Sequence, residues 1–224
     1  MHVISKRAWR RAVAADPSLE GPISEWYKVA RNAAWQSLID ARKVYPHADF
    51  VDPYTVFNIK GSSYRLIVRI EYRWQMIFVK FTNARRVQQG SMKKMSGAAV
   101  NYGKLLSRTK PEVVRNDGQN RLYIRQLEEL TSQKRVTAAE EKLIALLTVL
   151  VEEYEEKHYP VPDAAPLDVI RHLMDAHNLR QKDLADVFGT ESIVSDVLNG
   201  RRDLAKEHIR RLSARFHVSP SVFF

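Results

Sequence analysis

The chain has 224 residues, of which 45% are hydrophobic and 28% are charged, a balance typical of globular proteins and long enough for two modules. It contains no cysteine, which excludes disulfides, thiolate catalysis and cysteine-ligated metals. No export signal opens the chain and no run approaches the roughly 18 apolar residues of a membrane span, so we expect a cytoplasmic protein without a membrane partner.

Charge divides the chain into two unlike parts. Residues 1–115 hold 21 Lys and Arg against 8 Asp and Glu, whereas residues 116–224 hold 15 against 18. Within the second part, residues 116–168 hold 6 basic against 11 acidic side chains. The basic part suggests a polyanion partner, and its acidic neighbour suggests that the two parts neutralise each other. A solvated basic surface with no such partner is the alternative interpretation.

The first 81 residues change from helical to strand periodicity. Apolar spacing predicts helices over residues 4–15 and 22–42. Four short β-rich runs follow, over residues 48–52, 54–60, 64–72 and 74–81. Turn residues separate these runs, as in a meander. The pattern predicts an α+β domain over residues 1–81, with two helices on an antiparallel sheet whose other face carries arginines.

The rest of the sequence predicts a linker and then helices only. Residues 82–118 are basic and rich in turn residues, which favours a linker with one short helix. Helical spacing resumes in residues 119–160, where Thr137 is a plausible N-cap and Glu140 completes a capping box. Prolines then interrupt the chain, and residues 165–224 are predicted to form a separate domain of short helices.

The segment QKDLADVFGTESIVSDVLNG, residues 181–200, has the spacing of a helix-turn-helix. Apolar positions hold its two helices together, and Gly189 permits the tight turn. Its polar positions would then face the base edges and phosphates of a DNA major groove. The residues predicted to bind DNA are Gln181, Thr190, Ser192, Ser195, Asp196, Arg201 and Arg202. Ordinary packed helices with a solvated face would be the plainer interpretation.

The second half of the chain resembles the HigA antitoxins. The resemblance is carried by residues 181–224 and, upstream of them, by YIRQLEEL and VEEYEEKHYPVP, so that it covers about residues 120–224. It implies an antitoxin that neutralises a toxin and binds operator DNA as an autorepressor. We expect such a repressor to act as a homodimer on a pseudopalindromic operator.

The first half resembles the HigB toxins, ribosome-dependent mRNA endonucleases of the RelE fold. FNIKG followed by YRLIVRI is the most specific part of this resemblance, which covers residues 1–81. It implies the fold of helices on a sheet that the periodicity predicts, with mRNA on the ribosome as partner. The chain is therefore interpreted as a toxin and its antitoxin joined head to tail, which contact each other within one chain or between two copies.

Cleavage of RNA through its 2′-hydroxyl requires a base, stabilisation of the phosphorane charge and an acid for the leaving oxygen. The candidate catalytic residues, all cations on or beside the predicted sheet, are Lys60, Arg65, Arg69 and Lys80. Arg65 and Arg69 lie four apart on one strand and so share a face. Because lysine and arginine are poor bases at neutral pH, the four could equally serve only to bind RNA or to pair with the acidic region.

The sequence departs from the HigB pattern after IFVKF. The toxins usually continue with Thr-His and then Glu-Tyr-Asp, whereas this chain continues TNARRV, and the toxin-like half holds only His2 and His47. The side chain best suited to proton transfer near pH 7 is therefore missing beside the arginine strand, which puts catalysis in question.

Three functions remain open: a repressor whose toxin-like half is neutralised or inactive, an mRNA endonuclease gated by its own C-terminal domain, and a regulator with an RNA-binding first domain. None of them requires a cofactor or a metal.

Exposed ion pairs contribute only about 0 to 1 kcal/mol each, so contact between the halves would need apolar anchors. We expect Leu122, Leu127 and Leu130 to supply them.

Overall fold

A computed structural model describes residues 1–61, 63–81 and 101–224 of the chain. Its centre is a five-stranded sheet in the order β1-β5-β4-β3-β2. The strands are β1 (His2–Ile4), β2 (Asp49–Val51), β3 (Tyr54–Ile59), β4 (Tyr64–Glu71) and β5 (Met76–Phe81). Strands β2 to β5 form the predicted antiparallel meander, and β1 adds a parallel edge strand beside β5.

Three helices cover one face of the sheet: α1 (Arg7–Ala15), α2 (Glu20–Arg31) and α3 (Leu38–Val44). The prediction of one helix over residues 22–42 is wrong in its middle. Asn32 ends α2 by donating its side-chain amide to the Lys28 carbonyl at 2.8 Å, and Ser37 begins α3 by accepting the Asp40 amide at 3.4 Å. The predicted start of the first helix is also wrong, because residues 2–4 pair with β5 instead.

The core of this N-terminal domain (residues 1–81) lies between the sheet and its three helices. Phe57 of β3 and Leu66 and Val68 of β4 point toward the helices and are fully buried. The Trp26 ring of α2 lies 5.4 Å from the Phe57 ring. Alternation along β4 therefore sends Arg65 and Arg69 to the opposite face of the sheet, as predicted.

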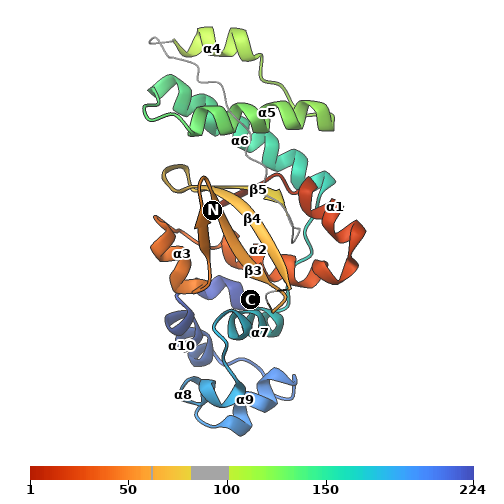
Figure 1. Cartoon of the computed structure of the whole chain (residues 1–224), viewed down its shortest axis with the longest axis vertical. Helices are drawn as coiled ribbons and strands as arrows, with labels where there is room; N and C mark the ends of the chain where they lie inside the picture. The colour runs from red at the N-terminus through yellow and green to blue at the C-terminus, as the bar shows by residue number, and fades with distance from the viewer. Residues whose placement is uncertain (62, 82–100) are drawn as a thin grey trace.

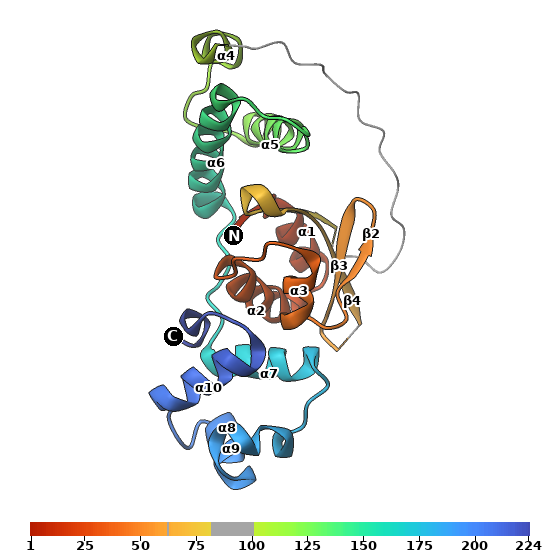
Figure 2. The same cartoon turned by 90° about the vertical axis from the view of Figure 1, so that its left-hand side faces the viewer.

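Helices α5 (Asp117–Thr131) and α6 (Ala138–His158) meet that opposite face at β1 and β5, and α4 (Tyr102–Thr109) packs on α6 away from the sheet (Figures 1 and 2). The predicted capping box begins α6, since Glu140 donates its amide to the Thr137 hydroxyl at 3.3 Å and accepts the Thr137 amide at 2.8 Å. Helix α4 falls in the segment predicted as a linker, of which residues 82–100 lie outside the described residues.

Short helices form the C-terminal domain at the other end of the molecule (Figure 1). They are α7 (Pro166–Ala176), η3 (Gln181–Leu184), α8 (Ala185–Phe188), α9 (Glu191–Leu198), α10 (Lys206–Phe216) and η4 (Pro220–Phe223). All of them fall within residues 165–224, where the sequence predicts short helices. The fold class is as predicted, an α+β domain joined to an all-α region that ends in a helix-turn-helix.

Candidate functional site

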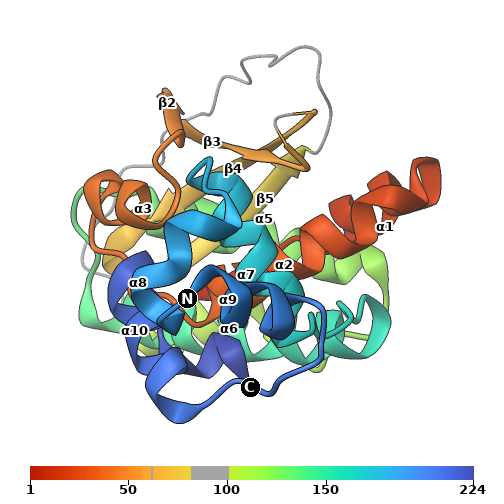
Figure 3. The same cartoon turned by 90° about the horizontal axis from the view of Figure 1, so that it is seen from below.

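Helices α8 and α9 form a helix-turn-helix at the tip of the C-terminal domain, on the side nearest the viewer in Figure 3. Gly189 joins them with a φ of 101°, a conformation that side chains beyond glycine rarely adopt. Val194 and Val197 are fully buried and hold α9 on the rest of the domain. Helix α9 consequently turns its polar side outward.

Five of the predicted DNA-binding residues are exposed on this tip, namely Gln181, Thr190, Ser192, Arg201 and Arg202. Ser195 and Asp196 are half-buried. Thr190 also has a structural role, because its hydroxyl accepts the Ile193 amide at 3.3 Å and caps α9. Ser195 accepts a hydrogen bond from the Asn199 side chain at 3.2 Å, so Asn199 is an exposed neighbour that the sequence prediction missed.

The sheet face that carries the candidate catalytic residues is partly covered. Arg69 is only 8% exposed, forms an ion pair with Glu71, and leaves one guanidinium nitrogen without a partner among the described residues. Burial raises the pKa of Glu71, and the neighbouring Arg69 opposes that rise. Lys80 forms an ion pair with Glu128 of α5, whereas Arg65 remains exposed. Two of the four cations are thus already neutralised by carboxylates of the same chain.

The fourth cation, Lys60, lies away from the other three. It occupies the turn between β3 and β4 with a φ of 52° and donates to the Ser18 hydroxyl. Its ammonium group also lies over the Tyr64 ring, 5.4 Å from the ring centroid. The structure therefore brings Arg69 and Lys80 under α5 but does not gather all four candidates into one site.

Apolar residues of α5 anchor its contact with the sheet. Leu127 is fully buried in a cluster with Met76 and Phe78 of β5, and Leu130 packs against the same cluster. The expectation for Leu122 is wrong: it remains 43% exposed, because it lies on the side of α5 turned away from the sheet cluster.

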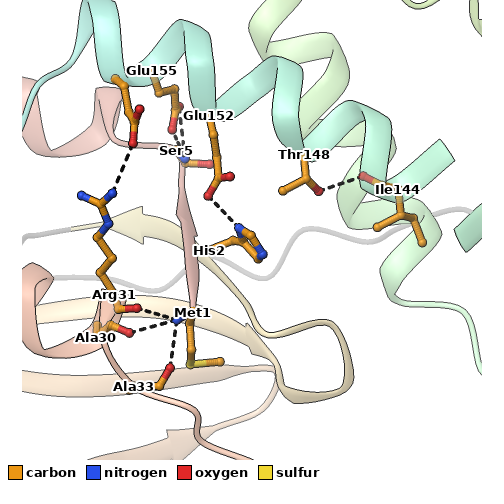
Figure 4. Close-up of polar contacts among 11 residues, drawn as sticks. Met1, His2, Ser5, Ala30, Arg31, Ala33, Ile144, Thr148, Glu152 and Glu155 are labelled. Atoms are coloured by element: carbon orange, nitrogen blue, oxygen red, sulfur yellow. Dashed lines mark hydrogen bonds and ion pairs between the residues drawn. The ribbon is translucent and has the colours of Figure 1, made fainter. Parts of the chain in front are cut away.

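Helix α6 contacts the N-terminal domain through a buried carboxylate (Figure 4). Glu155 is 0% exposed and accepts the backbone amides of Ser5, at 3.0 and 3.1 Å, and of Lys6, at 3.3 Å. The Asn120 side chain of α5 donates to the same carboxylate at 3.3 Å. Burial raises the pKa of Glu155 to about 7, although these hydrogen bonds oppose the rise.

Two exposed ion pairs flank Glu155 on α6. Glu152 contacts the His2 imidazole at 2.8 Å, and Glu156 contacts the Arg31 guanidinium at 3.6 Å. Carboxylates in the run VEEYEE thus face the first strand and the end of α2. The excess of acidic residues in 116–168 predicts such pairing, but it does not identify Glu155 as the carboxylate that is buried.

The C-terminal domain docks on the opposite side of the N-terminal domain, along α2 and α3. Lys28 of α2 is 7% exposed, and its ammonium group donates to the carbonyls of Ala164 and Phe224, at 2.8 and 2.6 Å, and to the Asp163 carboxylate at 3.1 Å. A buried ammonium is stable only with such partners. The sequence gives no sign of this contact.

A buried histidine completes the same contact. His172 of α7 lies 3.1 Å from the Tyr45 hydroxyl and 3.3 Å from the Glu25 carboxylate, and both partners belong to the N-terminal domain. His177, at the end of α7, contacts the Val44 carbonyl at 2.9 Å. One continuous apolar cluster runs beneath these contacts from the N-terminal into the C-terminal domain.

Comparison with known proteins assigns both halves. Residues 19–84 match the HigB toxin family, described as the RelE-like toxic component of a toxin-antitoxin system, and residues 170–223 match a helix-turn-helix family. The antitoxin HigA of Escherichia coli K12 is 34% identical over 113 residues, which are 47% of this chain and 81% of that relative. The HigA antitoxins of Escherichia coli O6:H1 and Shigella flexneri match equally well.

A RelE-like toxin fold followed by a helix-turn-helix defines a protein of the toxin-antitoxin class. The chain belongs to the HigA antitoxin family in its second half, and a HigB-type toxin domain precedes that half in the same chain. No helix in the described residues is long and apolar enough to cross a membrane. Those residues also contain no group of three or more His, Asp or Glu side chains placed to hold a metal ion.

Proposed function

We propose that this protein is an autorepressor that binds operator DNA through α9 while its own antitoxin half restrains its toxin-like half. One arrangement carries the proposal: α5 and α6 lie over the sheet face and the first strand, and the outer side of α9 is left exposed. A chain of this kind would neutralise its toxin domain and read DNA at the same time.

The contact of α5 supports restraint in cis. Lys80 and Arg69 lie on the covered part of the sheet: Glu128 of α5 occupies Lys80, whereas Arg69 is paired with Glu71 of its own strand. RNA would have to displace these carboxylates and the apolar contact of Leu127 together. We therefore expect the intact chain to bind RNA weakly.

We further propose that the toxin-like half does not cleave mRNA. Of its two histidines, His47 contacts the Asn178 side chain at 2.9 Å, and His2, although it lies beside Met76 on the Arg69 face of the sheet, is engaged by Glu152 of α6. Arginine and lysine alone supply charge stabilisation without a base near neutral pH.

Reversal of one contact charge tests the restraint and the inactivity together. The full chain with Glu128→Lys should bind a short RNA more tightly than wild type but should not cleave mRNA on translating ribosomes. The exposed Glu129→Lys substitution on the same helix is the matched control for the added charge. Toxin-like cleavage by the Glu128→Lys chain, abolished by Arg65→Ala, would favour the gated endonuclease instead.

Operator binding is tested on the recognition helix. A homodimer should protect two half-sites about 34 Å apart, or a multiple of that distance, because successive major grooves recur at that spacing. Ser195→Ala should relax sequence preference, whereas Arg201→Ala with Arg202→Ala should weaken binding to all sequences and lower its salt dependence. Unchanged affinity in the double variant would remove the phosphate contacts from the proposal.

A further inference from the structure

The turn between β1 and α1 holds a buried carboxylate almost entirely through main-chain amides. Glu155 is 0% exposed, and its hydrogen-bond donors are the amides of Ser5 and Lys6 and the side chain of Asn120. It forms no ion pair with a Lys or Arg side chain of the described residues. A buried carboxylate is costly unless its surroundings donate hydrogen bonds to it, and here two main-chain amides of the turn and the Asn120 amide do so.

The backbone of the turn explains that arrangement. Ser5 has a φ of 75° and Lys6 has φ −58° and ψ −20°, so that a left-handed residue precedes a right-handed one and two successive amides converge on one point. Such a nest binds anions, and here it opens directly onto the first turn of α1, whose nine residues add the positive end of their dipole.

Two side chains at this turn, Lys6 and Asn120, have a polar atom without a hydrogen-bond partner among the described residues. The Lys6 side chain is 4% exposed, and its ammonium has no hydrogen-bond or ion-pair partner among the described residues; it lies 5.3 Å above the Tyr27 ring. Asn120 of α5 is 2% exposed and donates its side-chain nitrogen to Glu155, while its oxygen, a hydrogen-bond acceptor, has no described partner and gives no support to an anion site. A cavity of about 380 Å³ adjoins the turn and is lined by Lys6, Trp9 and Arg10.

The antitoxin half supplies acceptors to the other cations of this helix start as well. Asp117 of α5 contacts the Arg7 guanidinium at 3.3 Å, and the His158 carbonyl of α6 accepts from Arg10 at 3.0 Å. The amides of the turn and these two arginines are thus all engaged by oxygen atoms of α5 and α6. A phosphate group presents oxygen acceptors of the same kind and charge.

We propose that the β1–α1 turn is a phosphate-binding site for RNA on the toxin-like domain, and that Glu155 occupies it in place of a phosphate. The adjoining cavity, with Trp9 and Arg10 in its wall, then has room for part of the neighbouring nucleotide. This site is separate from the sheet face that carries Arg69 and Lys80. Binding of RNA at this site rests on the proposed restraint, whereas binding of an anion by the turn rests only on the geometry of the turn.

The anion arm of the test uses the full chain with Glu155→Ala, which leaves a hole of carboxylate size at the turn. Its thermal unfolding midpoint should be lowered in sodium chloride and should recover, saturably, in inorganic phosphate or formate at equal ionic strength. The amide signals of Ser5 and Lys6 should shift in parallel. Glu152→Ala, which removes an exposed neighbour on α6, should respond equally to all three salts. Identical behaviour of Glu155→Ala in phosphate and chloride would overturn the site.

The RNA arm uses Glu155→Gln, which preserves side-chain size if the alanine variant does not fold. This variant should bind a short oligouridylate about tenfold more tightly than wild type, the equivalent of one charge-assisted contact. Adding Lys6→Met should abolish the gain. Recovery by phosphate without any gain in RNA affinity would overturn RNA as the ligand and leave a site for free phosphate.

A parallel measurement separates this inference from the proposed function. Glu128→Gln opens the contact at Lys80 without touching the turn. If Glu128→Gln increases RNA affinity and Glu155→Gln does not, the phosphate site fails and the restraint stands. If neither variant gains affinity, the proposed restraint fails, and the phosphate-recovery experiment still decides whether the turn is an anion site.

Discussion

The N-terminal domain is contacted on two sides, and the two contacts differ in chemistry. On the sheet side, α5 and α6 contribute carboxylates, with Glu128, Glu155 and Glu152 facing cations or main-chain amides. On the α2 side, the buried Lys28 ammonium donates to the Asp163 carboxylate and to the main-chain oxygens of Ala164 and Phe224, beside a histidine and over a continuous apolar cluster. Both contacts bury apolar residues, but the first places carboxylates on cations and main-chain amides of the sheet side, whereas the second places main-chain oxygens and one carboxylate around a single buried ammonium.

This difference indicates which part of the molecule can be released. A contact made with carboxylates competes directly with RNA for the same cations, and its exposed ion pairs weaken when those charges are screened by salt. A contact that shares its core with the neighbouring domain separates only if that core is exposed to water. We therefore expect the DNA-binding domain to stay attached to the toxin-like domain under conditions that loosen α5 and α6.

The largest effect should come from the apolar anchor of the charged contact. Leu127→Ala removes a fully buried side chain beside Met76 and Phe78, and substitutions of this kind lower the free energy of unfolding by about 4 kcal/mol. Leu122→Ala, five residues earlier on the same helix, removes a side chain that is 43% exposed and should change it by less than about 0.5 kcal/mol. Chemical denaturation measures both. Equal losses would mean that α5 does not anchor through Leu127.

Acidity should affect the α6 contact through Glu155. Its pKa is raised to about 7 from the usual 4.5, so the folded chain holds this proton more tightly than the unfolded chain does. The resulting stability is fully present below about pH 4.5 and is lost as the pH rises through about 7, on the order of 3 kcal/mol in total. Above pH 7, the free energies of unfolding of wild type and Glu155→Gln should therefore follow the same slope with pH. Between pH 4.5 and 7, that of wild type should fall relative to that of Glu155→Gln. Parallel curves across that window would contradict the prediction.

The contact on the α2 side should respond to Lys28. Lys28→Met leaves the carbonyls of Ala164 and Phe224 without their donor, which should lower the free energy of unfolding by about 2 kcal/mol. Lys43→Met removes an ammonium that is half exposed and pairs only within α3, and it serves as the control. Limited proteolysis should cut the Lys28→Met chain near residues 159–165 and spare the control. Resistance of both variants would place the strength of this contact in the apolar cluster alone.

Local patterns in the sequence predict the helix-turn-helix and the meander, because each is specified by neighbouring residues. Gly189 and the spacing of Val194 and Val197 identify the turn and the buried side of α9 without reference to the rest of the chain. The sequence does not predict β1, because the three residues of β1 carry no pattern of their own and its partner strand, β5, lies more than 70 residues away.

The contacts between domains are the part that the sequence does not reveal. Glu155 stands in a run of four glutamates around Tyr154, and only tertiary packing buries it while leaving Glu153 and Glu156 exposed. His172 likewise lies on a helix whose sequence is ordinarily amphipathic, and only the folded structure shows that it contacts Tyr45 and Glu25. Charge counting predicts that the halves attract each other, but it does not predict which side chains meet.

The smallest expected effect is the coupling energy of two ion pairs that both join the N-terminal domain to α5 or α6. Lys80 and Glu128 are 22% and 12% exposed, whereas Arg73 and Glu141 are 58% and 46% exposed at 3.1 Å. A double-mutant cycle with Lys80→Met and Glu128→Gln should give a coupling of about 1 kcal/mol that persists in salt, since partly buried pairs are screened weakly. The cycle for Arg73 and Glu141 should give about 0 to 0.5 kcal/mol and vanish at high salt. If both couplings disappear in salt, the Lys80 contact is a surface pair, and α5 restrains the toxin-like sheet through Leu127 alone.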